Sequence, residues 1–368
     1  MSAPVTVETA LKSLQPGRFK AAALEGLISD AMQSCGLPPE GAAKVAELMT
    51  EADLTGADAH GIFRLPQYVR RLKAGGVNPT PTISVARRGP AVAMVDGDNG
   101  MGHIVMAKAA ETAIEMAHYT GVAWVGVRRS NHAGPAALYA EMPVKHGMVG
   151  IYSVVASSNH MAVWGGTSSL LGTNPLAVGI PCGDEPPVVL DIATTVVSYG
   201  TVKKYVMQDK TLPEGLLVNK TDGSPVTDPK RTSEGLLLPI GGHKGSGLAL
   251  ILGILAGTLN NAAFGRDVVD FNADSSTETN TGHFMLALDV ERFMPAAMFG
   301  ALLKEQLDDL RSDTPLPGAG DIRMPGDQRA VRRAERASNG VPIPAPLERQ
   351  LDDLAAQLGV EPLGSRNG

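Results

Sequence analysis

The chain has few of the residues that stabilise small secreted scaffolds. Its 368 residues include only two cysteines, Cys35 and Cys182, which are far apart and belong to no CxxC pair. Such a pair provides neither a disulfide framework nor a zinc site, and no two histidines have the HExxH spacing of a catalytic metal centre. We therefore expect a cytoplasmic protein, kept in a reducing compartment, that binds no metal.

Long apolar runs and an excess of positive charge are also missing. The longest nearly apolar run, 247–259, is shorter than the about 20 residues that a membrane helix needs. The N-terminus lacks the basic and then apolar regions of a secretory signal. With a net charge of −6, the chain is not expected to have the positive surface of a nucleic-acid binder. Any anionic substrate must therefore be bound by local cations. We expect neither a membrane nor a nucleic acid as a partner.

The chain is long enough for two domains, and its 43% hydrophobic content is typical of a globular protein. Apolar residues at helical spacing predict helices over 19–34, 39–51 and 65–72. Mixed α/β structure follows over 80–200, with strands at 82–86, 91–97, 122–128, 148–155 and 186–194 and a helix at 104–119. Beyond these we expect a polar surface excursion (201–234), a buried helix (246–263), a strand (280–293), a helix (300–312), extended chain (313–347) and a last helix (347–358).

Two glycine clusters resemble phosphate-binding loops only in part. Gly100 and Gly102 follow an expected strand and precede a helix, but the third glycine of the dinucleotide fingerprint is missing, so the sequence disfavours a Rossmann site here. The cluster at 241–247 lacks Walker spacing. Its Lys244, beside glycines at a helix start, is compatible with an anion cradle and equally with a tight turn that carries a solvated lysine.

Two histidines lie in polar, glycine-flanked loops, His60 in DAHG and His132 in SNHAG. Each is a candidate acid or base, although a lone loop histidine is more often a surface residue. Arg64 follows His60 by four residues and could bind a carboxylate there. Asp191 ends an expected strand, where it is either a functional group beside a cleft or a helix cap.

Seven motifs in order carry a family resemblance from about residue 20 to 345. They begin with DLTGADAHGIFRLPQYVRRLKAGGVNP, VRRSNHAGPAALYA and WGGTSSLLGTNPLAVGIP, and end with VVLDIATT, LPEGLLV with DGSPVTDP, GGHKGSGLAL and NTGHF. The chain resembles the non-Rossmann malate/L-lactate dehydrogenase family, which includes sulfolactate, malate and ureidoglycolate dehydrogenases, diketogulonate reductase and piperideine-2-carboxylate reductase.

The resemblance implies an α/β fold with a largely antiparallel, non-Rossmann NAD(P)-binding domain and a helical domain formed from the N- and C-terminal regions. We expect the helical, substrate-binding part in 1–120 and 286–368, and the cofactor-binding part in 121–285. It also implies a homodimer with active sites in the cleft between domains. The implied activity is NAD- or NADP-dependent interconversion of a small 2-oxo acid and its 2-hydroxy acid. The alternatives are a cyclic ketimine reductase and a paralogue that binds the cofactor without catalysis.

The resemblance also assigns roles to residues. His60 is the implied proton donor, His132 the second candidate acid or base, and Arg64 the clamp for the substrate carboxylate. Asp191 orients or charge-stabilises His60. The implied cofactor site comprises Ala156, Ser157, Asp191, Ile192, Ala193, Lys244, Gly326 and Gln328.

Two positions depart from the family pattern. Ala59 stands where the family usually has a serine, directly before His60, so a hydroxyl thought to relay or orient the proton is missing. Asn159 and His160 stand in a loop that is often proline-rich in relatives and is expected to border the substrate. Both departures predict altered substrate specificity.

Overall fold

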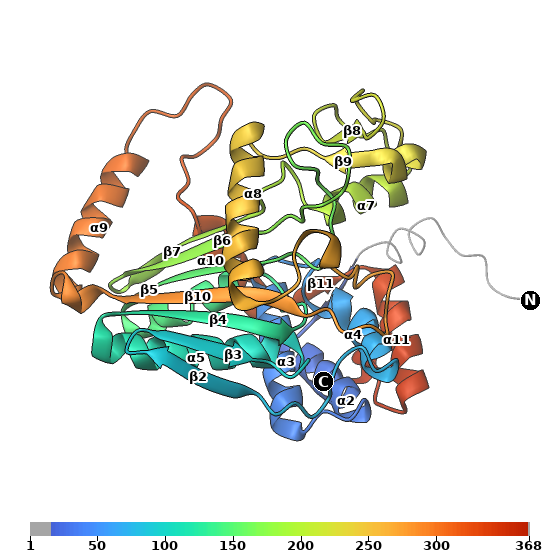
Figure 1. Cartoon of the computed structure of the whole chain (residues 1–368), viewed down its shortest axis with the longest axis horizontal. Helices are drawn as coiled ribbons and strands as arrows, with labels where there is room; N and C mark the ends of the chain where they lie inside the picture. Colours follow the sequence, from blue (N-terminus) through green and yellow to red (C-terminus); the bar gives the residue numbers. More distant parts are fainter. Residues whose placement is uncertain (1–15, 367–368) are drawn as a thin grey trace, which may run out of the picture. The chain divides into compact units, whose positions relative to one another are not determined.

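The computed structural model describes residues 16–366 (Figure 1). The N-terminal residues, for which the sequence predicts no secretory signal, lie outside this range. The chain forms two compact units, one from Met1–Ala74 with Asp327–Gly368 and the other from Gly75–Gly326. No helix within 16–366 is long and apolar enough to cross a membrane.

The first unit is helical and joins the two ends of the chain, as predicted. The short strands β1 (Gly17–Phe19) and β11 (Val341–Ile343) pair antiparallel. Leu24, Leu27, Ile28 and Met32, four of the apolar residues that predicted the first helix, are buried, whereas Ala22 is exposed. Extended chain was expected over 313–347, but α10 occupies much of it. The helices are α2 (Ala21–Ser34), α3 (Pro39–Leu54), η1 (Ile62–Arg64), α4 (Leu65–Lys73), α10 (Asp327–Asn339), α11 (Ala345–Leu358) and η7 (Leu363–Arg366).

The second unit contains a seven-stranded sheet in the order β2-β3-β4-β10-β5-β6-β7. Only β3 and β4 run parallel, because the crossover helix α5 (Gly102–Thr120) connects them. The α/β fold with a largely antiparallel sheet is therefore confirmed. The strands are β2 (Ser84–Gly89), β3 (Val92–Asp96), β4 (Val122–Ser130), β5 (Met148–Val154), β6 (Leu176–Cys182), β7 (Glu185–Ile192) and β10 (Thr281–Asp289).

Helices α5 and α8 (His243–Ala256) lie on opposite sides of this sheet (Figure 1). Leu252 and Ala256 of α8 pack with Val155 and Phe284 on one face. The sequence predicted a buried helix over 246–263, and one stripe of α8 is instead exposed. Leu250, Ile251 and Ile254 are 38%, 54% and 39% exposed. We call these three residues the α8 stripe.

The expected polar excursion over 201–234 instead folds around a small core of its own. Val202, Leu212, Leu217, Val226 and Leu237 are buried together there. The sparse apolar residues of this segment have no regular period, so no local pattern indicated a core. The segment contains α7 (Tyr199–Met207), β8 (Leu217–Asn219), η3 (Pro229–Glu234) and β9 (Gly235–Leu237).

The compact units and the expected functional parts have different boundaries. Residues 75–120 and 286–326 belong to the sheet unit, since α5 packs against β3, β4 and β10. Which part binds the substrate and which binds the cofactor stays a prediction. The remaining elements are α6 (Ala137–Ala140), η2 (Pro143–His146), η4 (Thr258–Asn260), η5 (Gly265–Asp267), η6 (Val290–Arg292) and α9 (Ala296–Arg311).

Candidate active site

Strand register brings several of the predicted residues to one edge of the large sheet. Ser130 at the end of β4 pairs with Thr281 at the start of β10. On the other side of β10, His283 pairs with Val154 at the end of β5. Leu176 at the start of β6 pairs with Ile192 at the end of β7. The segments at this edge carry His132, Ala156 with Ser157, and Asp191 to Ala193.

The His132 ring has a defined place in its loop. It stacks on Phe271, with ring centroids 4.9 Å apart and planes inclined by 4°. The backbone N–H of Gly134 approaches Nδ1 at 3.3 Å, at the long end of hydrogen-bond distances. The backbone N–H of Phe271 donates to the Ser157 carbonyl at 3.1 Å. Phe271 therefore joins the His132 ring to the Ala156–Ser157 segment, a role that the sequence analysis missed. The available signal was a lone aromatic residue in the polar stretch 270–280.

Asp191 holds the far end of the His132 loop. Its exposed carboxylate accepts a 2.8 Å hydrogen bond from the backbone N–H of Ala137, the first residue of α6. Deeper in the sheet, the Tyr152 hydroxyl lies 2.8 Å from Nδ1 of His283. Burial and the nearby Asp191 charge raise the pKa of Tyr152, and burial lowers the pKa of His283 to about 3. Both buried groups are thus uncharged at neutral pH.

Gly102 explains the incomplete dinucleotide fingerprint. A Cβ atom there would lie 2.2 Å from the Asn131 carbonyl oxygen and 2.5 Å from that of His132. Any larger residue would push the first turn of α5 away from the His132 loop. The glycine therefore serves close packing of two backbones, which accounts for Gly102 without a phosphate loop.

Lys244 lies exposed in the first turn of α8. Gly241 and Gly242 have φ values of 57° and 65°, which favour glycine, so the turn geometry explains both residues. The Ile240 N–H donates to the Thr194 carbonyl at 3.0 Å, which fixes this turn to the chain just after Ala193. Lysine and a helix N-terminus together attract anions.

The two remaining cofactor candidates belong to different units. The Val189 N–H donates to the Pro325 carbonyl at 3.0 Å, so the turn that contains Gly326 lies against β7, two residues before Asp191. Gln328 is exposed near the start of α10 in the helical unit. Gly326 therefore lies with the sheet-edge residues in the sheet unit, whereas Gln328 belongs to the helical unit.

His60 and Arg64 lie together in the helical unit, as the sequence predicted. The Arg64 Nε–H donates to the Ala59 carbonyl at 2.8 Å, which folds the guanidinium back along the His60 loop. Burial, and then the Arg64 charge, lower the pKa of His60 to about 4. His60 is therefore uncharged at neutral pH. Asp191 was expected to charge-stabilise His60, which would have favoured the charged ring.

Asp53, near the end of α3, holds the loop that carries His60 in place. Its carboxylate accepts a 2.7 Å hydrogen bond from the Ile62 N–H. A Cβ atom at Gly61 would lie 2.0 Å from the same carboxylate, so only glycine fits. Burial raises the pKa of Asp53 to about 8, with a further increase from Asp58 and an opposing effect of Arg336.

This raised pKa predicts a specific pH dependence of stability. Because the folded-state pKa of Asp53 exceeds the unfolded value of about 4, its contribution is complete below pH 4 and is lost as pH rises towards 8. We expect Asp53→Asn, which keeps a neutral acceptor, to lose less stability than the native chain between pH 5 and pH 8. Urea unfolding at both pH values measures this. The exposed Asp184→Asn is the control, and equal losses in Asp53→Asn and the native chain would contradict the prediction.

The loop with Asn159 and His160 is tied into the sheet unit. The His160 ring stacks on Tyr199 with centroids 3.9 Å apart, and burial lowers its pKa to about 4. The Asn159 side-chain amide donates to the Gly265 carbonyl at 2.7 Å. These contacts give both side chains a packing role, and the expected contact with substrate stays a prediction.

Comparison with known proteins gives consistent matches over nearly the whole chain. The sequence model of the malate/L-lactate dehydrogenase family matches residues 19–352. L-sulfolactate dehydrogenase of Methanocaldococcus jannaschii is 36% identical over 334 residues, which cover 91% of this chain and 95% of that protein. A Pseudomonas syringae pv. tomato reductase named for Δ1-pyrroline-2-carboxylate and Δ1-piperideine-2-carboxylate is 34% identical over 325 residues, covering 87% of this chain and 91% of that protein. A solved structure of the M. jannaschii enzyme superposes with a TM-score of 0.87 at 35% identity, covering 95% of this chain and 99% of that one.

Proposed function

This chain belongs to the malate/L-lactate dehydrogenase family, and from that premise we propose that it interconverts a small 2-oxo acid and the corresponding 2-hydroxy acid using NAD or NADP. The family comprises NAD(P)-dependent hydroxy acid dehydrogenases and ketimine reductases, and the chain is an oxidoreductase of this family. The observation that carries the proposal is the convergence of His132, Ser157 and Asp191 at one sheet edge.

The residues at this edge fit a dinucleotide. Lys244 and the α8 N-terminus supply positive charge for a diphosphate, and Ala156 and Ala193 have small side chains that let a ligand approach the backbone. In our proposal these residues hold the cofactor together with Ser157, Asp191, Ile192, Gly326 and Gln328. When bound, the nicotinamide supplies or accepts the hydride, which no protein side chain can store.

We assign the proton transfer to His132 before His60. Because His60 is uncharged at neutral pH, its ring lacks the proton that reduction of the substrate requires. In reduction, the His132 imidazolium passes the Nε2 proton to the carbonyl oxygen of the substrate, and in oxidation the neutral ring takes it back. Charging the ring gives up the 3.3 Å contact between Nδ1 and the Gly134 N–H. Asp191 positions the loop through Ala137.

Arg64 is the proposed clamp for the substrate carboxylate. A net charge of −6 makes a local cation necessary, and the bond to Ala59 holds the guanidinium beside His60. A planar guanidinium can bind a carboxylate with two parallel hydrogen bonds. We also propose that the protein works in the cytoplasm.

The direct test follows NADH and NADPH oxidation at 340 nm with pyruvate, oxaloacetate, 2-oxoglutarate, sulfopyruvate, diketogulonate and piperideine-2-carboxylate. Parallel wells with methylamine form imines in place. Turnover of a 2-oxo acid supports the proposal. Turnover of cyclic imines alone would replace it with ketimine reduction, the activity named for the Pseudomonas relative. Cofactor binding without any turnover would favour the non-catalytic paralogue.

Ala59 provides a test of specificity. We expect Ala59→Ser to change turnover or the order of preferred substrates without loss of folding, because the added hydroxyl would stand next to His60, in the loop that holds Arg64. The same substrate panel and a thermal melt measure both effects. Ala57→Ser, in the same loop, is the matched control. Identical kinetics across all substrates would remove any role for position 59.

We propose a homodimer in which the α8 stripe is covered by the second copy. Three adjacent aliphatic side chains on one helix face are costly to leave in water. We expect sedimentation of the native protein to give twice the 38.3 kDa mass of one chain. The Ile251→Glu variant should give a mass closer to that of one chain. Val331→Glu, an exposed position on α10, is the control. A native monomer, or an unchanged dimer in Ile251→Glu, would exclude this interface.

A further inference from the structure

A buried asparagine directly precedes His132 and joins three segments of the sheet unit. The Asn131 side-chain amide donates to the Asn99 carbonyl at 3.1 Å, to the Asn99 Oδ1 at 2.9 Å and to the Gly100 carbonyl at 3.0 Å. Its Oδ1 accepts from the Thr279 hydroxyl at 3.0 Å. Asn131, Asn99 and Thr279 are each at most 4% exposed. The orientation of the amide is fixed, because the opposite one would set Oδ1 against two backbone carbonyls.

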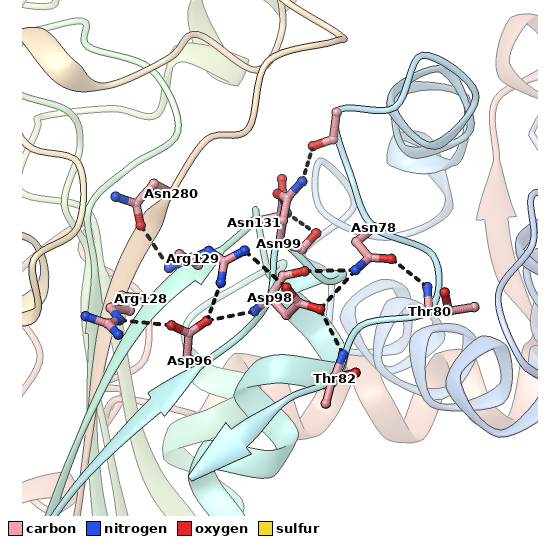
Figure 2. A network of polar contacts seen from close by, with 11 residues as sticks. Asn78, Thr80, Thr82, Asp96, Asp98, Asn99, Arg128, Arg129, Asn131 and Asn280 are labelled. Carbon is pink, nitrogen blue, oxygen red and sulfur yellow. Dashed lines mark hydrogen bonds and ion pairs between the residues drawn. The ribbon is translucent and has the colours of Figure 1, made fainter. Parts of the chain in front are cut away.

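The surrounding backbone is strained. Asp98, Asn99, Arg129 and Asn280 have φ values of 48°, 55°, 48° and 42°. Figure 2 shows these four residues in one polar network with Asn131. Residues in this left-handed region persist only where their surroundings hold them there, and they concentrate at functional sites.

Ion pairs and backbone contacts hold the strained residues in place. Arg129 contacts Asp96 and Asp98 at 3.1 Å each, and its backbone N–H donates to the Asn280 Oδ1 at 2.9 Å (Figure 2). The Asn99 N–H donates to the Arg129 carbonyl at 2.8 Å. The turn before α5 and the end of β4 are therefore locked together, two residues before Asn131 and three before His132.

We propose that Asn131 is a positioning residue for the His132 ring. It joins the loop that carries His132 both to the strained turn and, through Thr279, to the segment that carries Phe271, the stacking partner of that ring. Loss of the amide releases the loop from its stacking partner, while residues that bind the cofactor stay in place. This proposal rests on the proposed function only for its effect on turnover, since the position of the ring is measurable without catalysis.

The test compares shape-matched variants of the full chain. Asn131→Asp turns a donor into an acceptor that faces two carbonyls, and Thr279→Val removes a hydroxyl that Thr279→Ser keeps. Asn78→Ala is the control, because the Asn78 side-chain amide donates to Asp98 in the same network and no dashed line in Figure 2 joins Asn78 to Asn131. We expect kcat to fall about 10- to 100-fold in Asn131→Asp, as for a displaced catalytic group, with KM changed less than about threefold. The kcat of Thr279→Val should also fall. Thr279→Ser should keep a kcat close to that of the native chain.

A second readout does not depend on activity. NMR spectra of chains labelled at histidine Cε1, with the signal assigned through His132→Asn, report the environment and titration of the ring. We expect the His132 signal and its pH titration to change in Asn131→Asp and Thr279→Val and to remain native in Thr279→Ser and Asn78→Ala. If Asn131→Asp does not fold, the Thr279 pair decides the question. An unchanged His132 signal in the folded variants, or an equal change in Asn78→Ala, would overturn the proposal. A native chain that turns over no substrate but shows these signals would refute the proposed function and leave the positioning role intact.

Discussion

Replacing His132 with asparagine is expected to lower kcat/KM by about 10²–10⁴-fold, the usual contribution of a general acid or base. Asparagine keeps the size and polarity of the position but cannot transfer a proton near neutral pH. Cofactor affinity should change little, because the expected cofactor contacts belong to other residues. Steady-state kinetics with the best substrate of the panel and titration of NADH or NADPH binding measure the two quantities separately.

His60→Asn is the matched comparison for this experiment. With His132 as the proton donor, His60→Asn should retain most of its turnover, since His60 is uncharged at neutral pH. The reverse result, a large loss in His60→Asn and near-native turnover in His132→Asn, would assign the proton to His60. Substrate binding would then have to raise the pKa of His60, which burial and the Arg64 charge lower.

Arg64→Ala should raise KM for carboxylate substrates by roughly 30-fold or more, since truncating one partner of a desolvated, hydrogen-bonded charge pair costs roughly 2–5 kcal/mol. The change in kcat should be smaller, because the clamp binds a part of the substrate that does not react. Kinetics with the carboxylate substrate and with its neutral amide measure the difference. The amide should be nearly insensitive to the substitution.

Arg64→Lys separates charge from geometry. Lysine keeps the positive charge but lacks the planar fork and the Nε–H that donates to the Ala59 carbonyl. We expect its KM to lie between those of the native chain and Arg64→Ala. Equal effects of Arg64→Ala on the acid and on the amide would contradict a carboxylate clamp and leave Arg64 as a support of the His60 loop.

The candidate site shows what local sequence patterns can predict and what they cannot. Ser130 and Val154 end different strands, and no local pattern records that both flank β10 at the same edge. The loop motifs singled out His132 and Asp191, but the hydrogen bond from Ala137 to Asp191 depends on the pairing of distant strands. Phe271 and Asn131 were missed for the same reason, since their contacts are made across the sheet edge.

The sequence by itself determined the family and many of the local elements, although it missed α10. The helical spacing of apolar residues was enough to predict α2, α3 and α4, because a 3.6-residue period can be recognised within a short stretch of the chain. The tertiary structure alone decided the pairing of β6 with β5 and β7, the exposed α8 stripe and the need for glycine at position 102. Each of these depends on which surfaces meet after folding, and residues far apart in the chain supply those surfaces.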